Sequence, residues 1–93
     1  MKNEEVVKNF LRKRAASGSN LTSTGNRLIS YCTCIAEWGE QYLVVNFTKY
    51  SNTTSRHLGY LLRMIEKEGI RWQDIDGVPR GVFDLIPKFK YNV

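Results

Sequence analysis

The sequence predicts a single α+β domain spanning residues 1–93, in the order helix, three antiparallel strands, helix. Apolar residues recur at helical spacing near the N-terminus and again in residues 53–68, and they alternate at strand spacing between these segments. With 93 residues, 42% of them hydrophobic, the chain can build one modest core. We expect both helices to pack on one face of the sheet, and residues 70–93 to form an irregular C-terminal extension.

The first helix is expected within residues 1–16. Asn3 is a candidate N-cap, and Glu4 and Glu5 place negative charge in the first turn, where the helix dipole favours it. The apolar side of this helix comprises Val6, Val7, Phe10 and Leu11. The run Ser17-Gly18-Ser19 is typical of a connector, so we expect the helix to end before it.

Three strands are expected in residues 20–48. The segments are a short strand at 21–24, a Gly25-Asn26 turn, a long central strand at 28–38, a two-residue Gly39-Glu40 loop and a third strand at 42–48. Both faces of the central strand are fairly apolar, which predicts an interior position in the sheet. In the third strand, Leu43, Val45 and Phe47 should face the same way.

The main helix is expected at residues 53–68. Its apolar face consists of Leu58, Leu61, Leu62 and Ile65, which follow the i, i+3, i+4, i+7 pattern. Polar residues at 51–55 offer several N-caps, and Gly69 is well placed to end the helix.

The opposite face of this helix is the candidate functional surface. Helix N-termini attract anions, and cations on a helix face can follow a phosphate backbone. The predicted nucleic-acid or anion-binding residues are Thr53, Thr54, Ser55, Arg56, His57, Tyr60, Arg63 and Lys67, with secondary basic contacts from Lys8, Arg12, Lys88 and Lys90. The alternative interpretation is that the hydroxyl groups only cap the helix and that the cations form an ordinary solvated face.

Charge and hydropathy narrow the class of partner. The net charge is +5 and the pI is about 9.4, which favours acidic partners such as nucleic acid or a ribonucleoprotein complex, although many small basic proteins bind neither. No apolar run is long enough to span a membrane, and acids occupy the place of a signal peptide's apolar stretch. We therefore expect a cytoplasmic protein with no membrane partner.

The nucleophilic and metal-ligating residue types in the sequence do not form a recognisable catalytic or metal site. Cys32 and Cys34 lie two apart on a strand, and with His57 they give only three ligands at unusual spacing, so we expect neither a metal nor a cofactor. His57 is the only histidine, and Ser55 two positions before it does not make a triad. The sequence thus predicts a non-enzymatic protein. A hydrolase or nuclease built on His57 is kept as a third hypothesis.

Two segments resemble a known family. Residues 28–36 (LISYCTCIA) and 50–57 (YSNTTSRH) are similar to the motifs L-x-S-Y-x-T-x-I-A and Y-S-x-T-T-S-R-H of small uncharacterised bacteriophage proteins. The resemblance covers residues 20–65 and implies a phage origin, with residence in the host cytoplasm. The family has no established activity. From the basic helix face we expect an accessory protein that binds nucleic acid or a host nucleic-acid-acting complex. The alternative is a protein-binding inhibitor or adaptor of a host defence system such as CRISPR, without direct nucleic-acid contact.

The predicted order of elements also resembles that of double-stranded RNA-binding domains. There, cations at the start of the last helix contact phosphates, and residues 55–57 would occupy that position here. The paired lysines and the long loop between the first strands are missing, so this remains an analogy of fold. Both a monomer and a homodimer are compatible with the sequence, because an exposed sheet edge permits pairing between copies.

Overall fold

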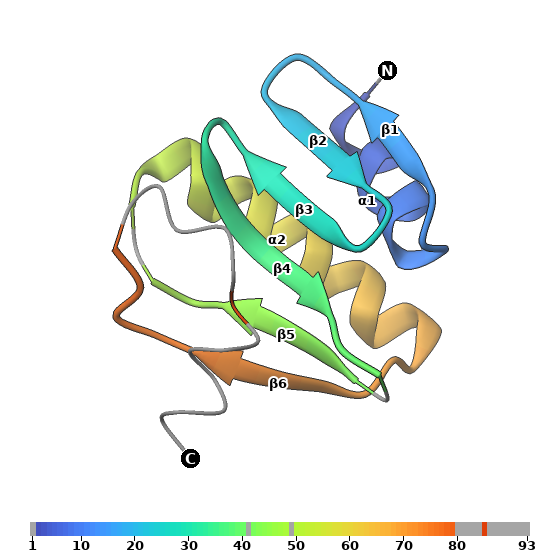
Figure 1. Ribbon diagram of the computed structural model, residues 1–93. Helices are drawn as coiled ribbons and strands as arrows, with labels where there is room; N and C mark the ends of the chain where they lie inside the picture. The colour runs from blue at the N-terminus through green and yellow to red at the C-terminus, as the bar shows by residue number, and fades with distance from the viewer. Residues whose placement is uncertain (1, 41, 49, 80–84, 86–93) are drawn as a thin grey trace.

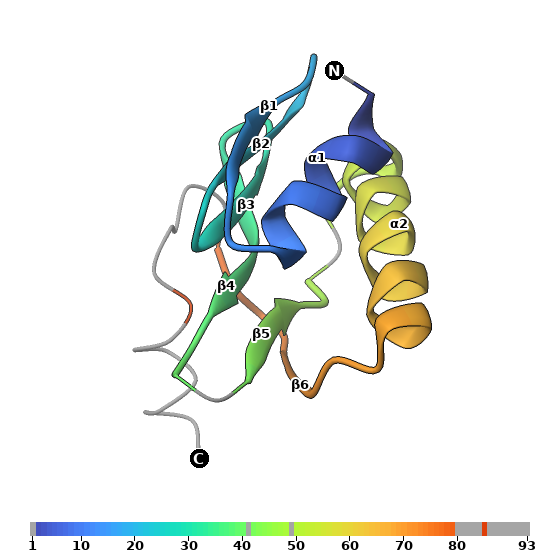
Figure 2. The same ribbon diagram turned by 90° about the vertical axis from the view of Figure 1, so that its right-hand side faces the viewer.

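The computed structural model describes residues 2–40, 42–48, 50–79 and 85. Within them it contains two helices and one six-stranded sheet, which confirms the α+β class. The elements are α1 (Asn3–Leu11), β1 (Ala15–Ser17), β2 (Leu21–Thr24), β3 (Arg27–Ser30), β4 (Thr33–Trp38), β5 (Leu43–Asn46), α2 (Asn52–Glu68) and β6 (Trp72–Ile75). Both helices lie on one face of the sheet, as expected (Figures 1 and 2).

The sheet has the order β1-β2-β3-β4-β5-β6. Neighbours from β1 to β5 are antiparallel, whereas β6 runs parallel to β5 because α2 carries the chain across the sheet between them. The predictions of three strands and of a purely antiparallel sheet are therefore wrong. Part of the region expected to be irregular, residues 70–93, forms the edge strand β6. The expected α-β-β-β-α order, on which the analogy with double-stranded RNA-binding domains rested, is not the order observed.

The predicted central strand at residues 28–38 is divided into β3 and β4. A two-residue turn at Tyr31 and Cys32 reverses the chain, so that Ser30 pairs with Thr33. Tyr31 has a φ of 57°, in the left-handed region that bulky side chains seldom adopt. The turn carries no glycine, proline or asparagine, so none of its residues signals a break in the strand.

The segment after α1 also differs from expectation. The helix ends at Leu11 rather than near residue 16, and Ala15–Ser17 pairs with β2 as the edge strand β1. Lys13, with a φ of 59°, lies at the change of direction. Asn3 is the first helical residue and Lys2 occupies the N-cap position, so the predicted Asn3 cap is wrong.

Of the two tight turns predicted between strands, the first is confirmed and the second is a longer loop. Gly25 and Asn26 form the two-residue turn between β2 and β3, and the φ of 105° at Gly25 requires glycine. The loop between β4 and β5 is longer than the predicted Gly39-Glu40 pair. It extends over residues 39–42, with the Gly39 N–H donating to the Tyr42 carbonyl oxygen.

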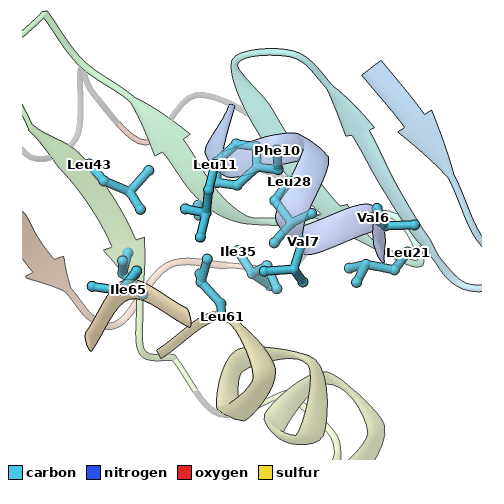
Figure 3. Packing of buried hydrophobic residues seen from close by; sticks show 12 residues of the cluster. Val6, Val7, Phe10, Leu11, Leu21, Leu28, Ile35, Leu43, Leu61 and Ile65 are labelled. Atoms are coloured by element: carbon cyan, nitrogen blue, oxygen red, sulfur yellow. The ribbon is translucent and has the colours of Figure 1, made fainter. Parts of the chain in front are cut away.

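The main core lies between the helices and the sheet (Figure 3). Its fully or almost fully buried side chains include Val6, Val7, Phe10 and Leu11 from α1, Leu21, Leu28, Ile35 and Leu43 from the sheet, and Leu61 and Ile65 from α2. The predicted apolar side of α1 is confirmed, and Leu58 and Leu62 of α2 are half-buried at the border of this core. A second, smaller cluster on the other face of the sheet consists of Cys34, Val44, Ile75, Val78 and Leu85.

The limits of α2 agree with the sequence to within one residue. Ser51 is the N-cap, and its hydroxyl oxygen accepts a hydrogen bond from the Thr54 N–H. Gly69 ends the helix with a φ of 66°. Between these ends, the helix buries Thr54, His57, Leu61 and Ile65.

Candidate nucleic-acid interface

The outer surface of α2 carries the predicted cations on one face. Arg56, Arg63 and Lys67 are exposed, and Tyr60 between them is half-buried. We call these four residues the basic face. The Arg63 guanidinium lies over the Tyr60 ring, 5.7 Å from its centroid. Along the helix axis the basic face extends about 16 Å, at about 1.5 Å per residue.

The three cations of the basic face are available to an external partner. None of them forms an ion pair with any residue in the described part of the chain, where the ion pair observed is between Arg27 and Glu37. Exposed cations without an ion-pair partner keep their charge for a ligand, although surrounding salt screens it.

Helix α1 borders the basic face. The two helices are in contact on the same face of the sheet (Figure 2). A groove of about 150 Å³ between them is lined by Glu4 of α1 and by Tyr60, Arg63, Met64 and Lys67 of α2. Lys8 on α1 and Arg12 at its C-cap are exposed, while the predicted contacts Lys88 and Lys90 lie outside the described residues. The acid in this groove weakens the positive potential locally.

The predicted residues at the start of α2 are divided between surface and interior. Ser55 is exposed and Thr53 is half-buried, whereas Thr54 and His57 are buried, at 6% and 1% exposure. The side chains of Thr54 and His57 therefore face the protein rather than a ligand. Their hydrogen bonds show what they do there.

His57 is the centre of a buried set of polar side chains, which we call the His57 cluster. Its Nδ1 lies 2.7 Å from the Ser30 Oγ of β3, and its Nε2 lies 3.3 Å from the Asn3 Nδ2 of α1. Ser30 Oγ is also 3.2 Å from Thr54 Oγ1, to which the Ser51 hydroxyl donates at 3.1 Å. The cluster, made of Asn3, Ser30, Ser51, Thr54 and His57, thus joins both helices to the sheet.

The surroundings of His57 favour the neutral ring. An amide nitrogen can only donate, so Asn3 leaves Nε2 as an acceptor and places the ring proton on Nδ1, which donates to Ser30. Burial lowers the pKa of His57, and the nearby charge of Arg56 lowers it further. At neutral pH we therefore expect no positive charge from His57.

Ser30, not Ser55, is the serine beside the histidine. Sequence reasoning missed it because 27 residues separate Ser30 from His57. The pair has the separation of a nucleophile and its base, but both side chains are only 1% exposed, so a substrate has no access to them. Their arrangement accounts for packing rather than for catalysis.

A second missed residue is Tyr31, at the turn between β3 and β4. Its side chain is 54% exposed, and its ring stacks on the His57 ring with a centroid separation of 6.2 Å. A pocket of about 110 Å³ lies beside it, lined among others by Ser30, Tyr31, Thr33 and Ser51. Only the exposure of an aromatic residue marks this position, and exposure cannot be read from the sequence.

The described residues hold no group of three histidine, cysteine or acidic side chains placed to bind a metal ion. Cys34 is buried and its thiol donates to the Ala36 carbonyl oxygen, while Cys32 is exposed as a free thiol. No helix in the described part of the chain is long and apolar enough to cross a membrane.

A protein-family model matches residues 3–77, which is most of the chain. The chain belongs to DUF8033, a family of unknown function. The DUF8033 match begins in α1 and extends past β6, so it is wider than the resemblance described for residues 20–65, and it includes the basic face and the whole His57 cluster. Comparisons with curated proteins and with solved structures gave no match.

Proposed function

We propose that this DUF8033 protein is a non-enzymatic nucleic-acid-binding protein that contacts phosphate groups through the basic face of α2. The observation that carries the proposal is that Arg56, Arg63 and Lys67 share one exposed helix face without ion-pair partners among the described residues. Cations that neutralise phosphates release counterions, and this release supplies most of the affinity of non-specific binding.

The His57 cluster supports this function by holding the helix that carries the basic face. It ties the first turn of α2 to β3 and to α1, and the core residues Leu61 and Ile65 fix the next two turns. A helix held in this way presents its cations in a fixed array, which lowers the entropic cost of binding. In the proposal, Thr54 and His57 position the helix, and Arg56, Tyr60, Arg63 and Lys67 make the contacts.

The test is a binding titration with labelled single-stranded and duplex DNA and RNA at about 50 and about 200 mM salt. If all three cations contact phosphates, the slope of log K against log salt should be about −2.7 on duplex DNA, since each phosphate contact contributes about −0.9. The variant Arg63→Glu should reduce the magnitude of this slope by about 0.9 and weaken binding to every sequence similarly.

The matched control is Arg71→Glu. Arg71 is also exposed, so the change in net charge is the same, but it lies between α2 and β6, outside the basic face. We expect this variant to bind almost as the wild type does. Equal losses for the two variants, or no binding by the wild type at low salt, would contradict the proposed interface.

A second candidate function is a protein-binding inhibitor or adaptor, and one observation favours it. An apolar groove of about 620 Å³ at the edge of the sheet is lined by Phe47, Leu62, Ile65, Glu66, Gly69, Ile70 and Trp72. Trp72 is 39% exposed, and large exposed aromatic residues are common in protein interfaces. In this case Trp72→Ala should abolish capture of the partner and Arg63→Glu should not.

The phage origin inferred from the two motifs gives the second candidate a biological setting. The partner would be a host protein complex that acts on nucleic acid, including a defence complex such as CRISPR. A pull-down from host lysate with the wild type and with Trp72→Ala tests it, and a partner recovered equally by both would contradict the groove as its binding site.

A further inference from the structure

We infer that the nucleic acid bound by this protein is single-stranded, and that Tyr31 provides a platform on which one unpaired base stacks at the Arg56 end of the basic face. This inference rests on the proposed function and names its substrate class. Proteins that bind single strands combine cations that follow the backbone with aromatic rings on which bases stack. A basic face alone does not distinguish single strands from duplexes, so the aromatic group decides the class.

Tyr31 has the properties that a stacking platform requires. Its ring stacks on the His57 ring, with 6.2 Å between the centroids and 29° between the planes, and 54% of the side chain is nevertheless exposed. The His57 ring itself is fixed by Ser30 and Asn3. A ring held in place before binding loses little conformational freedom when a base stacks on it.

Tyr31 also lies at the correct end of the basic face. The turn between β3 and β4 is beside the start of α2 (Figure 1), where Ser30 and His57 are joined. His57 adjoins Arg56 in the sequence, and the charge of Arg56 acts on the His57 ring. A strand whose phosphates follow Lys67, Arg63 and Arg56 is therefore led toward Tyr31.

The pocket beside Tyr31 suits the edge of a base. Its volume is about 110 Å³. Three of the side chains that line it bear hydroxyl groups, Thr33, Tyr50 and Ser51. The hydroxyls of Tyr50 and Ser51 are already hydrogen-bonded within the protein, so the pocket gives the edge of a base a polar wall. A base within a duplex is stacked between its neighbours and cannot reach this position, which is why we infer an unpaired base.

Backbone geometry provides a clean variant for the test. Tyr31 has a φ of 57°, which glycine adopts without strain. Tyr31→Gly thus removes the ring while keeping the turn, and thermal melting will show that it folds. Tyr31→Phe keeps the aromatic ring, and Trp72→Ala removes the other exposed large aromatic side chain of the described residues, on β6.

The experiment measures the affinity of each variant for a labelled single strand and for a duplex of the same sequence. We expect Tyr31→Gly to bind the single strand about 5- to 150-fold more weakly, the range found when one stacked base is lost. Its affinity for the duplex should not change. Tyr31→Phe and Trp72→Ala should bind the single strand as the wild type does.

Two results would overturn the inference while leaving the proposed function intact. In the first, Arg63→Glu weakens binding but Tyr31→Gly binds the single strand as tightly as the wild type. In the second, Tyr31→Gly lowers the affinity for duplex and single strand equally. If instead the wild type binds neither strand, or Arg63→Glu has no effect, the proposed function itself fails.

Discussion

The buried His57 makes a prediction about how stability depends on pH. The folded protein holds the ring neutral, with Asn3 donating to Nε2 and Nδ1 donating to Ser30, and burial followed by the charge of Arg56 lowers its pKa. In the unfolded chain the ring has its ordinary pKa of about 6.5. Between the folded and the unfolded pKa values, the unfolded chain therefore binds more protons, and the free energy of unfolding must fall as the pH falls.

The magnitude has an upper limit set by a single proton. If the folded form stays neutral throughout, the free energy of unfolding decreases by about 1.3 kcal/mol from about pH 7 to about pH 5.5, and by about 1.9 kcal/mol to about pH 5. Above about pH 7.5 this contribution is complete and no longer changes. A folded-state pKa closer to the ordinary value gives a smaller decrease, and its size reports how strongly the cluster excludes the charged ring.

Urea unfolding followed by tryptophan fluorescence between about pH 5 and 7.5 measures this dependence. The assay is clean because His57 is the only histidine in the chain, so no other side chain with an ordinary pKa titrates in this range. The variant His57→Phe should lose most of the slope. Arg56→Gln should keep most of it, since burial contributes more than the Arg56 charge.

Two outcomes would refute the reasoning. If the wild type and His57→Phe have the same slope between about pH 5 and 7.5, the ring is not held neutral by its burial. If stability increases as the pH falls, the folded protein prefers the charged ring, and the assignment of the Asn3 and Ser30 hydrogen bonds is wrong.

The same unfolding assay checks two further predictions. Leu61→Ala should lower the free energy of unfolding by about 2–5 kcal/mol, because Leu61 is fully buried between the helices and the sheet; a loss below about 1 kcal/mol would contradict its place in the core. Gly69→Ala should destabilise the protein by about 1 kcal/mol, because φ is 66° at this position. Gly59→Ala within α2 should stabilise it by about 0.5–1 kcal/mol, because an added Cβ meets open space. Effects of the same sign for the two substitutions would contradict the backbone geometry.

The parts of the fold that the sequence predicted are those encoded within a few residues. The apolar side of α1, the limits of α2 and the Gly25-Asn26 turn all follow from patterns shorter than two helical turns. The basic face was predicted for the same reason, because helical periodicity alone brings Arg56, Arg63 and Lys67 to one side. Local geometry is fixed by local sequence wherever a cap, a turn or a period is strong.

The edge strands could not be predicted because they are defined by their backbone pairing with a neighbouring strand and not by a pattern in their own residues. In β6, Trp72, Gln73 and Asp74 are exposed and only Ile75 is buried, so no alternation marks the strand. Its backbone is ordered by hydrogen bonds to β5, whose position depends on the whole sheet. The break at Tyr31 was missed for a related reason, since a turn with a positive φ at tyrosine is held by the surrounding contacts and not by its own preference.

The His57 cluster shows what the two motifs have in common. One motif contributes Ser30 and Tyr31, the other Ser51, Thr54, Arg56 and His57, and in the fold these residues meet at one place.

Residues that are adjacent in the sequence differ in exposure at this place. Ser30 is buried against His57 while Tyr31 faces solvent, and Arg56 and His57, about 100° apart on α2, face solvent and interior respectively. A sequence motif cannot separate the residues that support such a site from those that contact a partner, because both kinds alternate along the same short segments. Burial separates them: Tyr31 and Arg56 are exposed, whereas Ser30, Thr54 and His57 are buried, so in the proposed function the first two make contacts and the other three support them.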